Sequence, residues 1–148
     1  MFRGLSLHTL DPKGRIIIPA RFRDIIKVDG SGVMLTLMDG AAWVYTYTEW
    51  QNVESKVLAR EKTSEYLRRF RRFFIGSAAD CKCDKQGRIL IPQSLRSAAE
   101  LDREIMLVGN LTHFEIWDKN KYEAEGQRFF AEDVNKEEVR NEIAELGL

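Results

Sequence analysis

Short apolar runs that end at a proline occur twice along the chain and give it two similar halves. Each run, residues 16–18 and 89–91, holds three consecutive apolar residues, a pattern typical of buried strands. The proline that follows, Pro19 or Pro92, suits the first position of a helix, where its missing N–H costs nothing. Apolar residues then recur at i, i+3 and i+4, which predicts a short helix with one buried face. These residues are Phe22, Ile25 and Ile26 in the first half and Leu95, Ala98 and Ala99 in the second.

The two halves contain an internal repeat of 13 residues. Residues 11–23 read DPKGRIIIPARFR and residues 84–96 read DKQGRILIPQSLR, with 7 identities at a shift of 73 positions. In each copy an aspartate and a glycine take the first and fourth positions preferred in a type I turn. Gly14 and Gly87 then let the chain enter the strand without steric cost. Each copy therefore predicts a turn, a strand and a helix.

Further strands are expected on both sides of each turn. Segments 5–10 and 76–83 precede the turns and predict a hairpin in each half. A second strand pair follows each helix: 33–38 with 43–48 through Asp39-Gly40, and 105–108 with 114–117 around Gly109-Asn110. Because each half is too small to hold a core alone, we expect the two halves to interlock and bury each other's apolar runs.

Two helical regions complete the expected structure. Residues 50–74 predict a helix broken near 62–64, with Thr63 or Ser64 as an N-cap. Residues 68–74, RRFRRFF, are the densest basic segment and could bind nucleic acid or a membrane surface. The pattern favours a helix whose phenylalanines are buried and whose arginines are solvated. Residues 118–146 predict a second helical region with an acidic face, which either is solvated, shields the basic hairpins or docks on a neighbouring subunit.

The charge distribution is uneven although the formal net charge is zero. Residues 118–148 hold 5 Lys and Arg against 9 Asp and Glu, and residues 1–117 hold 18 against 14. No apolar run approaches the ~18 residues that cross a bilayer. The first residues lack the layout of a signal peptide. These features predict a cytosolic protein with a mildly basic body and an acidic tail.

The doubled pattern D-x-x-G-R-I-x-I-P-x-x-x-R resembles the MraZ family, whose halves are each similar to the AbrB/SpoVT DNA-binding domain. The resemblance covers nearly the whole chain, including Glu115-Ile116-Trp117. It departs from the family at Pro12, where members vary, and at Gln86, which replaces a basic residue of the second turn. The resemblance implies an α+β, mainly β, fold: a duplicated AbrB/SpoVT-type swapped-hairpin β-barrel with interdomain and C-terminal helices. The expected segments are domain 1 at 5–51, a connecting helical region at 52–75, domain 2 at 76–122 and a C-terminal helical tail at 123–148.

The same resemblance implies a cytoplasmic, nucleoid-associated transcriptional regulator of the division and cell-wall gene cluster, acting as a repressor. Its implied partners are double-stranded DNA with tandem promoter repeats and further copies of the chain in a ring-shaped homo-oligomer, with no membrane. Repetition of the hairpins in a ring would raise the low affinity of one module through effective concentration.

The turns supply the candidate DNA contacts. Arg15 and Arg88 begin the strands, where a guanidinium can reach a guanine edge or a phosphate. Lys13 and Lys85 suit phosphate as point charges. The alternative is that each arginine only pairs with the turn aspartate, as Arg15 with Asp11. The weaker candidates are Arg3, Arg21, Arg23 and Arg96, and for the last two an ion pair that braces helix to hairpin is an equal alternative.

Enzymatic and metal-binding functions find little support in the sequence. It contains no Walker-type phosphate loop, no nucleophile elbow and no H-E-x-x-H. Cys81 and Cys83 would make half a zinc site, with His8 and His113 as the two histidines, so no cofactor and no metal is expected. Two other functions stay open: an antitoxin-like module that captures a partner protein, and a structural ring whose basic residues serve assembly alone.

Overall fold

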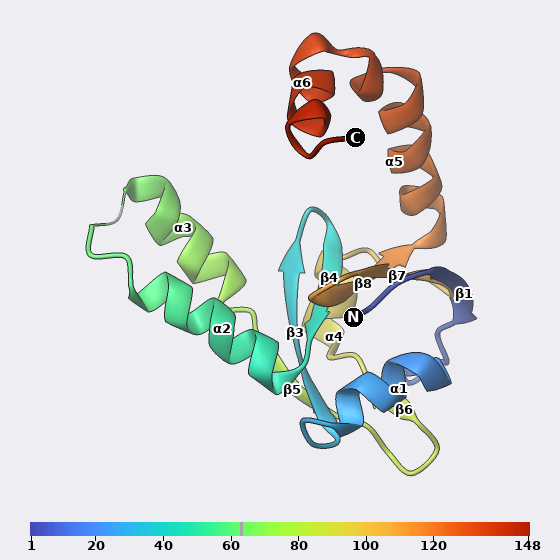
Figure 1. Ribbon diagram of the computed structural model, residues 1–148. Helices are drawn as coiled ribbons and strands as arrows, with labels where there is room; N and C mark the ends of the chain where they lie inside the picture. Colours follow the sequence, from blue (N-terminus) through green and yellow to red (C-terminus); the bar gives the residue numbers. More distant parts are fainter. Residues whose placement is uncertain (63) are drawn as a thin grey trace. The chain divides into compact units, whose positions relative to one another are not determined.

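The computed structural model describes residues 1–62 and 64–148 and divides them into two compact units, Met1–Asp118 and Lys119–Leu148 (Figure 1). The first unit is α+β with antiparallel strands. In its described residues, one sheet has the strand order β1-β7-β8-β4-β3-β5 and a second, two-stranded sheet pairs β2 with β6. The strands are β1 (Leu5–Thr9), β2 (Arg15–Ile17), β3 (Gly32–Met38), β4 (Ala41–Tyr45), β5 (Ala79–Lys82), β6 (Arg88–Leu90), β7 (Glu104–Asn110) and β8 (His113–Asp118). The helices of this unit are α1 (Ala20–Lys27), α2 (Tyr47–Leu58), α3 (Glu65–Phe74) and α4 (Gln93–Ala98).

Strand pairing runs between the two halves of the sequence. β1 pairs with β7, β5 with β3, β8 with β4, and the two turn-following strands β2 and β6 pair with each other. The prediction that the strands on either side of each turn form a hairpin was therefore wrong. The expected interlocking is confirmed, because the main core cluster draws residues from both halves. The predicted boundaries at 5–51, 52–75, 76–122 and 123–148 stay predictions.

The two apolar runs face this shared core with only two of their three residues. Ile16, Ile18, Ile89 and Ile91 are at most 1% exposed, whereas Ile17 is 58% and Leu90 52% exposed. The prediction of fully buried runs was wrong at these middle positions. Side chains alternate along a strand, and the outer face of the β2–β6 pair is uncovered. On the following helices, Ala98 is exposed rather than buried, and Pro19 and Pro92 are N-caps, one position before the helices start.

Three phenylalanines from distant parts of the chain fill the centre of the core. Phe2, Phe22 and Phe114 come from the N-terminal segment, α1 and β8, and each is at most 2% exposed. Their ring centroids lie 5.0 to 5.1 Å apart. Aromatic rings at this separation add favourable edge and tilted contacts to the burial of apolar surface.

The N-terminal segment crosses β7 at Gly109. The N–H of Gly109 donates to the carbonyl of Gly4 at 2.8 Å, and Phe2 forms an isolated bridge with Leu111. Gly109 is thus part of β7, and the turn before β8 lies at Leu111, where φ is 63°. The prediction of a turn around Gly109-Asn110 was wrong because this glycine serves a close backbone approach.

We expect Gly109→Ala to lower the free energy of unfolding by about 1–3 kcal/mol, the usual cost of overpacking. An added Cβ would lie 2.4 Å from the backbone nitrogen of Arg3, and a backbone atom cannot move aside as the end of a flexible side chain can. Gly126→Ala is the matched control, since nothing lies within 4 Å of its added Cβ, and it should be neutral or slightly stabilising. Denaturant unfolding of both variants checks this, and equal midpoints would contradict it.

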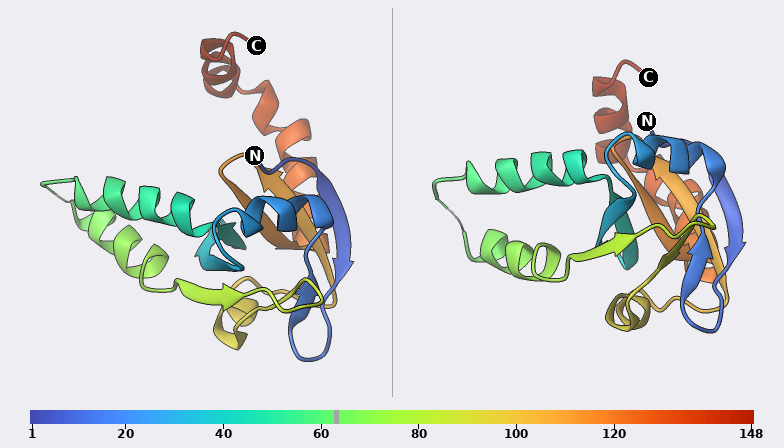
Figure 2. Two further views of the ribbon diagram at one scale, coloured as in Figure 1. Left: turned by 60° about the horizontal axis from the view of Figure 1, so that its bottom comes forward. Right: turned by 90° about the horizontal axis from the view of Figure 1, so that it is seen from below.

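Helices α2 and α3 form an antiparallel arm that projects from the sheet (Figure 2). Its root is packed: Trp50 and Phe74 stack at 5.7 Å, and Phe70 and Phe74 at 4.8 Å. Thr46 and Ser64 cap the two helices, so the predicted break is confirmed, while Thr63 lies outside the described residues. The buried phenylalanine face is confirmed only in part, because Phe73 is 66% exposed.

The second unit contains α5 (Lys119–Ala131), a short 3-10 helix η1 (Asp133–Asn135) and α6 (Glu137–Glu145). The expected helical region is thus confirmed, with a break at η1. None of the helices in residues 1–62 and 64–148 is long and apolar enough to span a membrane.

Candidate nucleic-acid interface

The two turns of the repeat have nearly the same geometry. The carboxylate of Asp11 accepts hydrogen bonds from the backbone N–H groups of Lys13 at 2.9 Å and Arg15 at 2.8 Å. Asp84 accepts from the backbone N–H groups of Gln86 and Arg88, both at 2.9 Å. These bonds close each turn around the aspartate and fix where the strand begins.

Each aspartate also forms an ion pair with the arginine that starts the strand. The Nε of Arg15 lies 2.7 Å from Asp11 Oδ2, and the Nε of Arg88 lies 2.8 Å from Asp84 Oδ2. The hydrogen bond from the backbone N–H of Arg15, together with its side chain, lowers the pKa of Asp11 to about 2, so the carboxylate stays charged. The pKa of Asp84 is lowered by the same set of bonds from Arg88.

These ion pairs leave part of each guanidinium available. The arginine side chains remain 32% and 27% exposed. Only Nε is used, and within the described residues the terminal nitrogens of Arg15 and Arg88 have no hydrogen-bond acceptor. The structure thus contains the pairing that we considered as the alternative role. The ion pair fixes the orientation of each guanidinium and leaves its terminal nitrogens accessible.

Pairing of β2 with β6 brings the two arginines onto one small surface. In the register of this ribbon, Arg15 lies opposite Leu90 and Ile17 lies opposite Arg88. The exposed face therefore alternates cation and apolar side chain on both strands. The apolar members were missed in the sequence, although Arg15 and Ile17 are two residues apart and must share a face. We call Arg15, Ile17, Arg88 and Leu90 the ribbon face.

The glycines of the turns tie the ribbon to the opposite half. The N–H of Ile91 donates to the carbonyl of Gly14, and that of Ile18 donates to the carbonyl of Gly87, both at 2.9 Å. The two glycines have φ values of +88° and +76°, so a side chain there would be strained.

Arg23 and Arg96 lie behind the turns and pack against these glycines across the repeat. An added Cβ on Gly87 would lie 2.4 Å from a terminal nitrogen of Arg23, and one on Gly14 would lie 2.5 Å from Arg96. The Nε of Arg96 donates to the carbonyl of Ile91 at 2.9 Å. Neither arginine makes an ion pair with a described residue, so they brace the turns by packing against the glycines and, for Arg96, by this hydrogen bond.

Arg3 and Arg21 lie near the N-terminal segment. Arg21 is exposed, stacks its guanidinium over the ring of Phe22 at 5.0 Å, and approaches Gly4. The backbone of Arg3 crosses Gly109. Arg3 and Arg21 therefore do not share the aspartate contacts that hold Arg15 and Arg88 at the turns.

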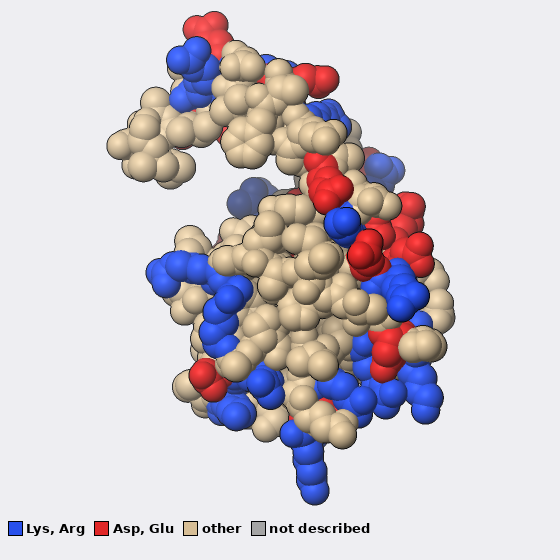
Figure 3. All heavy atoms as spheres, turned by 90° about the vertical axis from the view of Figure 1, so that its right-hand side faces the viewer, with Lys and Arg blue, Asp and Glu red and all other residues tan. Residues whose placement is uncertain are grey.

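Lys13 and Lys85 are exposed at the turn tips. On the face shown in Figure 3, Lys and Arg side chains gather along the lower edge, where the loop before β6 lies in Figure 1. Each turn carries one lysine and one arginine against one aspartate, which leaves a modest positive charge that would attract phosphate.

A polar cluster lies at the end of β7 and on β8. Buried Glu115 accepts hydrogen bonds from His113 at 3.0 Å, Asn110 at 3.0 Å and Trp117 at 2.8 Å. Burial by itself raises the pKa of Glu115, but these three donors outweigh it and hold the pKa below the ordinary value of 4.5. The ring of His113 also stacks on Trp43 at 4.2 Å.

The lowered pKa of Glu115 predicts acid sensitivity. A carboxyl group whose pKa is lower in the folded state stabilises the fold above its unfolded pKa, and this contribution is lost as pH falls through the folded pKa. We expect the free energy of unfolding to drop below about pH 4.5, and less steeply in Glu115→Gln. Denaturant unfolding between neutral and acid pH measures this. The same pH profile in both proteins would refute a role for Glu115.

The two cysteines are free thiols on β5 and just after it. Burial raises the pKa of Cys81 to about 11, with smaller effects from Asp80 and Cys83. Groups of three or more side chains able to hold a metal ion are absent from residues 1–62 and 64–148.

The repeated turns and the pairing across the halves can be compared with known proteins. The family model described as "MraZ protein, putative antitoxin-like" matches residues 1–73 and again 74–142. The chain belongs to the MraZ family. MraZ relatives include proteins named transcriptional regulator MraZ from Desulforapulum autotrophicum, 54% identical, and Desulfosudis oleivorans, 51% identical, each aligned over the full length of both chains. A relative of the same name from Shewanella frigidimarina is 40% identical over 83% of each chain.

The two matches of the MraZ model coincide with the internal repeat. The break between them, after residue 73, falls at the end of α3, where the arm returns to the sheet. Each match thus contains one turn, one arginine of the ribbon face and one helix that packs on the other half.

Proposed function

We propose that this MraZ-family chain is a transcriptional regulator that binds duplex DNA sequence-specifically through the ribbon face. The observation that carries the proposal is that β2–β6 pairing sets two like turns, each with a partly exposed arginine, side by side. The names of the relatives, all transcriptional regulators rather than enzymes, support it. Two guanidinium groups at fixed positions on a two-stranded ribbon suit the major groove, which admits such a ribbon.

Each group on and beside the ribbon face has a role in this proposal. Arg15 and Arg88 would contact guanine edges or phosphates, and Ile17 and Leu90 would contact apolar parts of the bases, such as the thymine methyl group. Lys13 and Lys85 would contact phosphates. Asp11 and Asp84 would hold the arginines in position, since an oriented guanidinium loses less freedom on binding.

The finer features rest on the family resemblance. We infer a duplicated AbrB/SpoVT-type swapped-hairpin barrel, and the cross-half pairing of β2 and β6 supports it. We further infer a cytoplasmic, nucleoid-associated repressor of the division and cell-wall gene cluster that binds promoter repeats as a ring. Because one ribbon face has few cations, several copies on tandem repeats would supply the affinity.

A second candidate function is protein capture in the manner of an antitoxin, which the description of the family model favours. Gel shift with the DNA upstream of the chain's own gene separates the two candidates. DNA binding that weakens steeply as salt rises supports the regulator, because phosphate contacts release counterions. The absence of a shift, or a shift independent of salt, would favour protein capture. A native mass showing only monomer would remove the ring.

A further inference from the structure

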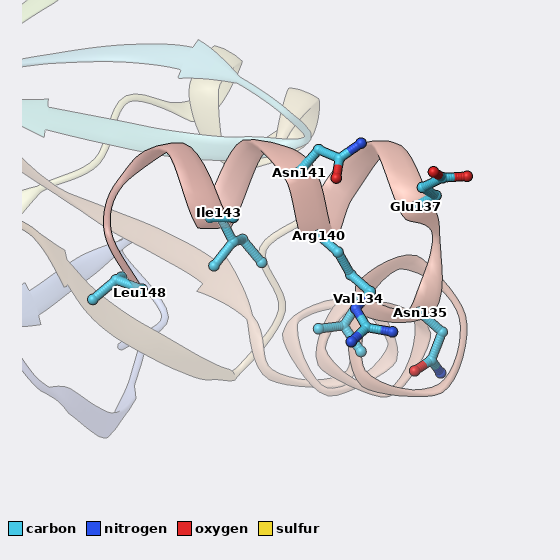
Figure 4. Close-up of a pocket in the computed structure, with 8 residues that line it drawn as sticks. Val134, Asn135, Glu137, Arg140, Asn141, Ile143 and Leu148 are labelled. Carbon is cyan, nitrogen blue, oxygen red and sulfur yellow. The ribbon is translucent and has the colours of Figure 1, made fainter.

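The C-terminal unit leaves most of its apolar surface uncovered. In α5, η1 and α6 no residue is buried, and Phe130, Leu146 and Leu148 are 73%, 74% and 87% exposed. Beside α6 lies a hollow whose apolar lining includes Val134, Ile143 and Leu148 (Figure 4). A helical unit of this size rarely holds a stable core alone, so its apolar side chains need a partner surface.

The outer half of the α2–α3 arm offers a groove of complementary character. Its floor is apolar, formed by Val57, Leu67 and Phe70, and its volume is about 240 Å³. Its rim is basic, formed by Lys56, Arg60 and Arg71. Trp50 and Phe74 fill the space between the helices at the root, whereas the groove residues lie toward the tip. A groove with this lining suits the apolar face of an amphipathic acidic helix.

The charges of the two surfaces are opposite. Residues 119–148 carry 8 Asp and Glu against 5 Lys and Arg, and residues 47–74 carry 7 Lys and Arg against 4 Asp and Glu. On α6, Glu138, Glu142 and Glu145 lie along one flank of the stripe that leads to Leu146. The C-terminal end of a helix also carries partial negative charge, which a basic rim stabilises.

The chain enters the arm and leaves the first unit at different points of the sheet. β4 and β8 are antiparallel, so Tyr45, where the chain turns into the arm, and Asp118, where it leaves the first unit, lie at opposite ends of this pair. The groove lies a further three helical turns along α2, about 15 Å from that helix's start. We take the occupant of the groove to be α6 of a second copy, because the ring assembly proposed above requires surfaces through which copies associate.

We propose that α6 of one chain docks in the α2–α3 groove of a second copy, with Leu146 and Leu148 on the apolar floor. Glu142 and Glu145 then face Arg60 and Arg71 of that copy. This contact deepens the proposed function by naming the surfaces through which copies associate, and it rests on that function only in requiring self-association.

Charge reversal tests the contact in the absence of DNA. One chain carries Arg60→Glu with Arg71→Glu, and another carries Glu142→Lys with Glu145→Lys. All four positions are exposed, so both chains should unfold like the unaltered protein. A control chain carries Gln51→Glu and Asn52→Glu, which place two acids on exposed positions at the root of the arm.

Sedimentation velocity and native mass measurement give the readout. Each reversed chain alone should self-associate about tenfold more weakly or worse, because like charges now meet. An equimolar mixture should recover assemblies that contain both chains, since the arm of one then attracts the tail of the other. The control chain should associate like the unaltered protein.

Several results would overturn the contact. One is an equimolar mixture of the two reversed chains that stays as dissociated as each chain alone. Another is a reversed chain that self-associates as strongly as the unaltered protein. A third is an unaltered protein that is monomeric. If association recovers only when all four substitutions are made in the same chain, the contact lies within one chain, and the proposal is also overturned. Leu146→Ser with Leu148→Ser is a second variant, which should weaken association without changing the unfolding midpoint. Since Arg15 and Arg88 are untouched, failure here leaves DNA binding intact.

Discussion

Replacing Arg15 and Arg88 together with alanine is expected to weaken binding to the DNA upstream of the chain's own gene about a hundredfold or more. Each arginine that makes a bidentate contact with a base contributes about 1–3 kcal/mol of discrimination, and two such contacts are lost. The fold should persist, because both side chains lie on the uncovered side of the ribbon. Fluorescence anisotropy with a labelled duplex at fixed salt measures the change.

The matched control for this pair is Arg69→Ala with Arg72→Ala. Arg69 forms an i, i+4 ion pair with Glu65 at 2.6 Å, as Arg15 does with Asp11, and it lies in the densest basic segment of the chain. The control should retain nearly full affinity. If the arm variant loses affinity and the ribbon variant does not, then α3 rather than the ribbon face is the DNA-binding element.

Phe114→Ala is expected to lower the free energy of unfolding by about 3–5 kcal/mol, the usual cost of removing a buried phenylalanine. Phe114 is fully buried and contacts both Phe2 and Phe22, so its loss leaves a cavity where the N-terminal segment, α1 and β8 meet. Chemical denaturation gives the value. Because both halves share this core, the transition should remain a single one.

Phe73→Ala serves as the comparison for core truncation. Phe73 is 66% exposed on the arm, and its removal should change stability by less than about 0.5 kcal/mol. Equal losses from the two substitutions, or two separate transitions in the Phe114 variant, would contradict a single core built from both halves.

The repeat made much of the fold predictable. Turn, strand and helix in each copy follow from the spacing of aspartate, glycine, apolar run and proline, and the interlocking follows from the small size of each half. The order of the strands did not follow. A strand as short as Arg15–Ile17 can pair with any neighbour, and nothing local in the sequence distinguishes β6 from β1 as its partner.

The candidate site could be predicted in part for a similar reason. The turn arginines were identified from their position before each strand, and their ion pairs with Asp11 and Asp84 were foreseen as an alternative. The exposure of Ile17 and Leu90 was not predicted, because three consecutive apolar residues suggest a strand that is buried on both faces. The role of Gly109 was also missed, since the crossing of the N-terminal segment is a long-range contact.

The central claim is that the ribbon face reads DNA sequence, and the ratio of affinities for the upstream duplex and for a scrambled duplex tests it most directly. The ratio is measured for the unaltered chain, for Arg15→Ala with Arg88→Ala, and for Lys13→Ala with Lys85→Ala. Loss of the arginines should bring the ratio close to one. Loss of the lysines should weaken binding to both duplexes alike and reduce the salt dependence by about two phosphate contacts. A ratio that survives the removal of Arg15 and Arg88 would contradict the account.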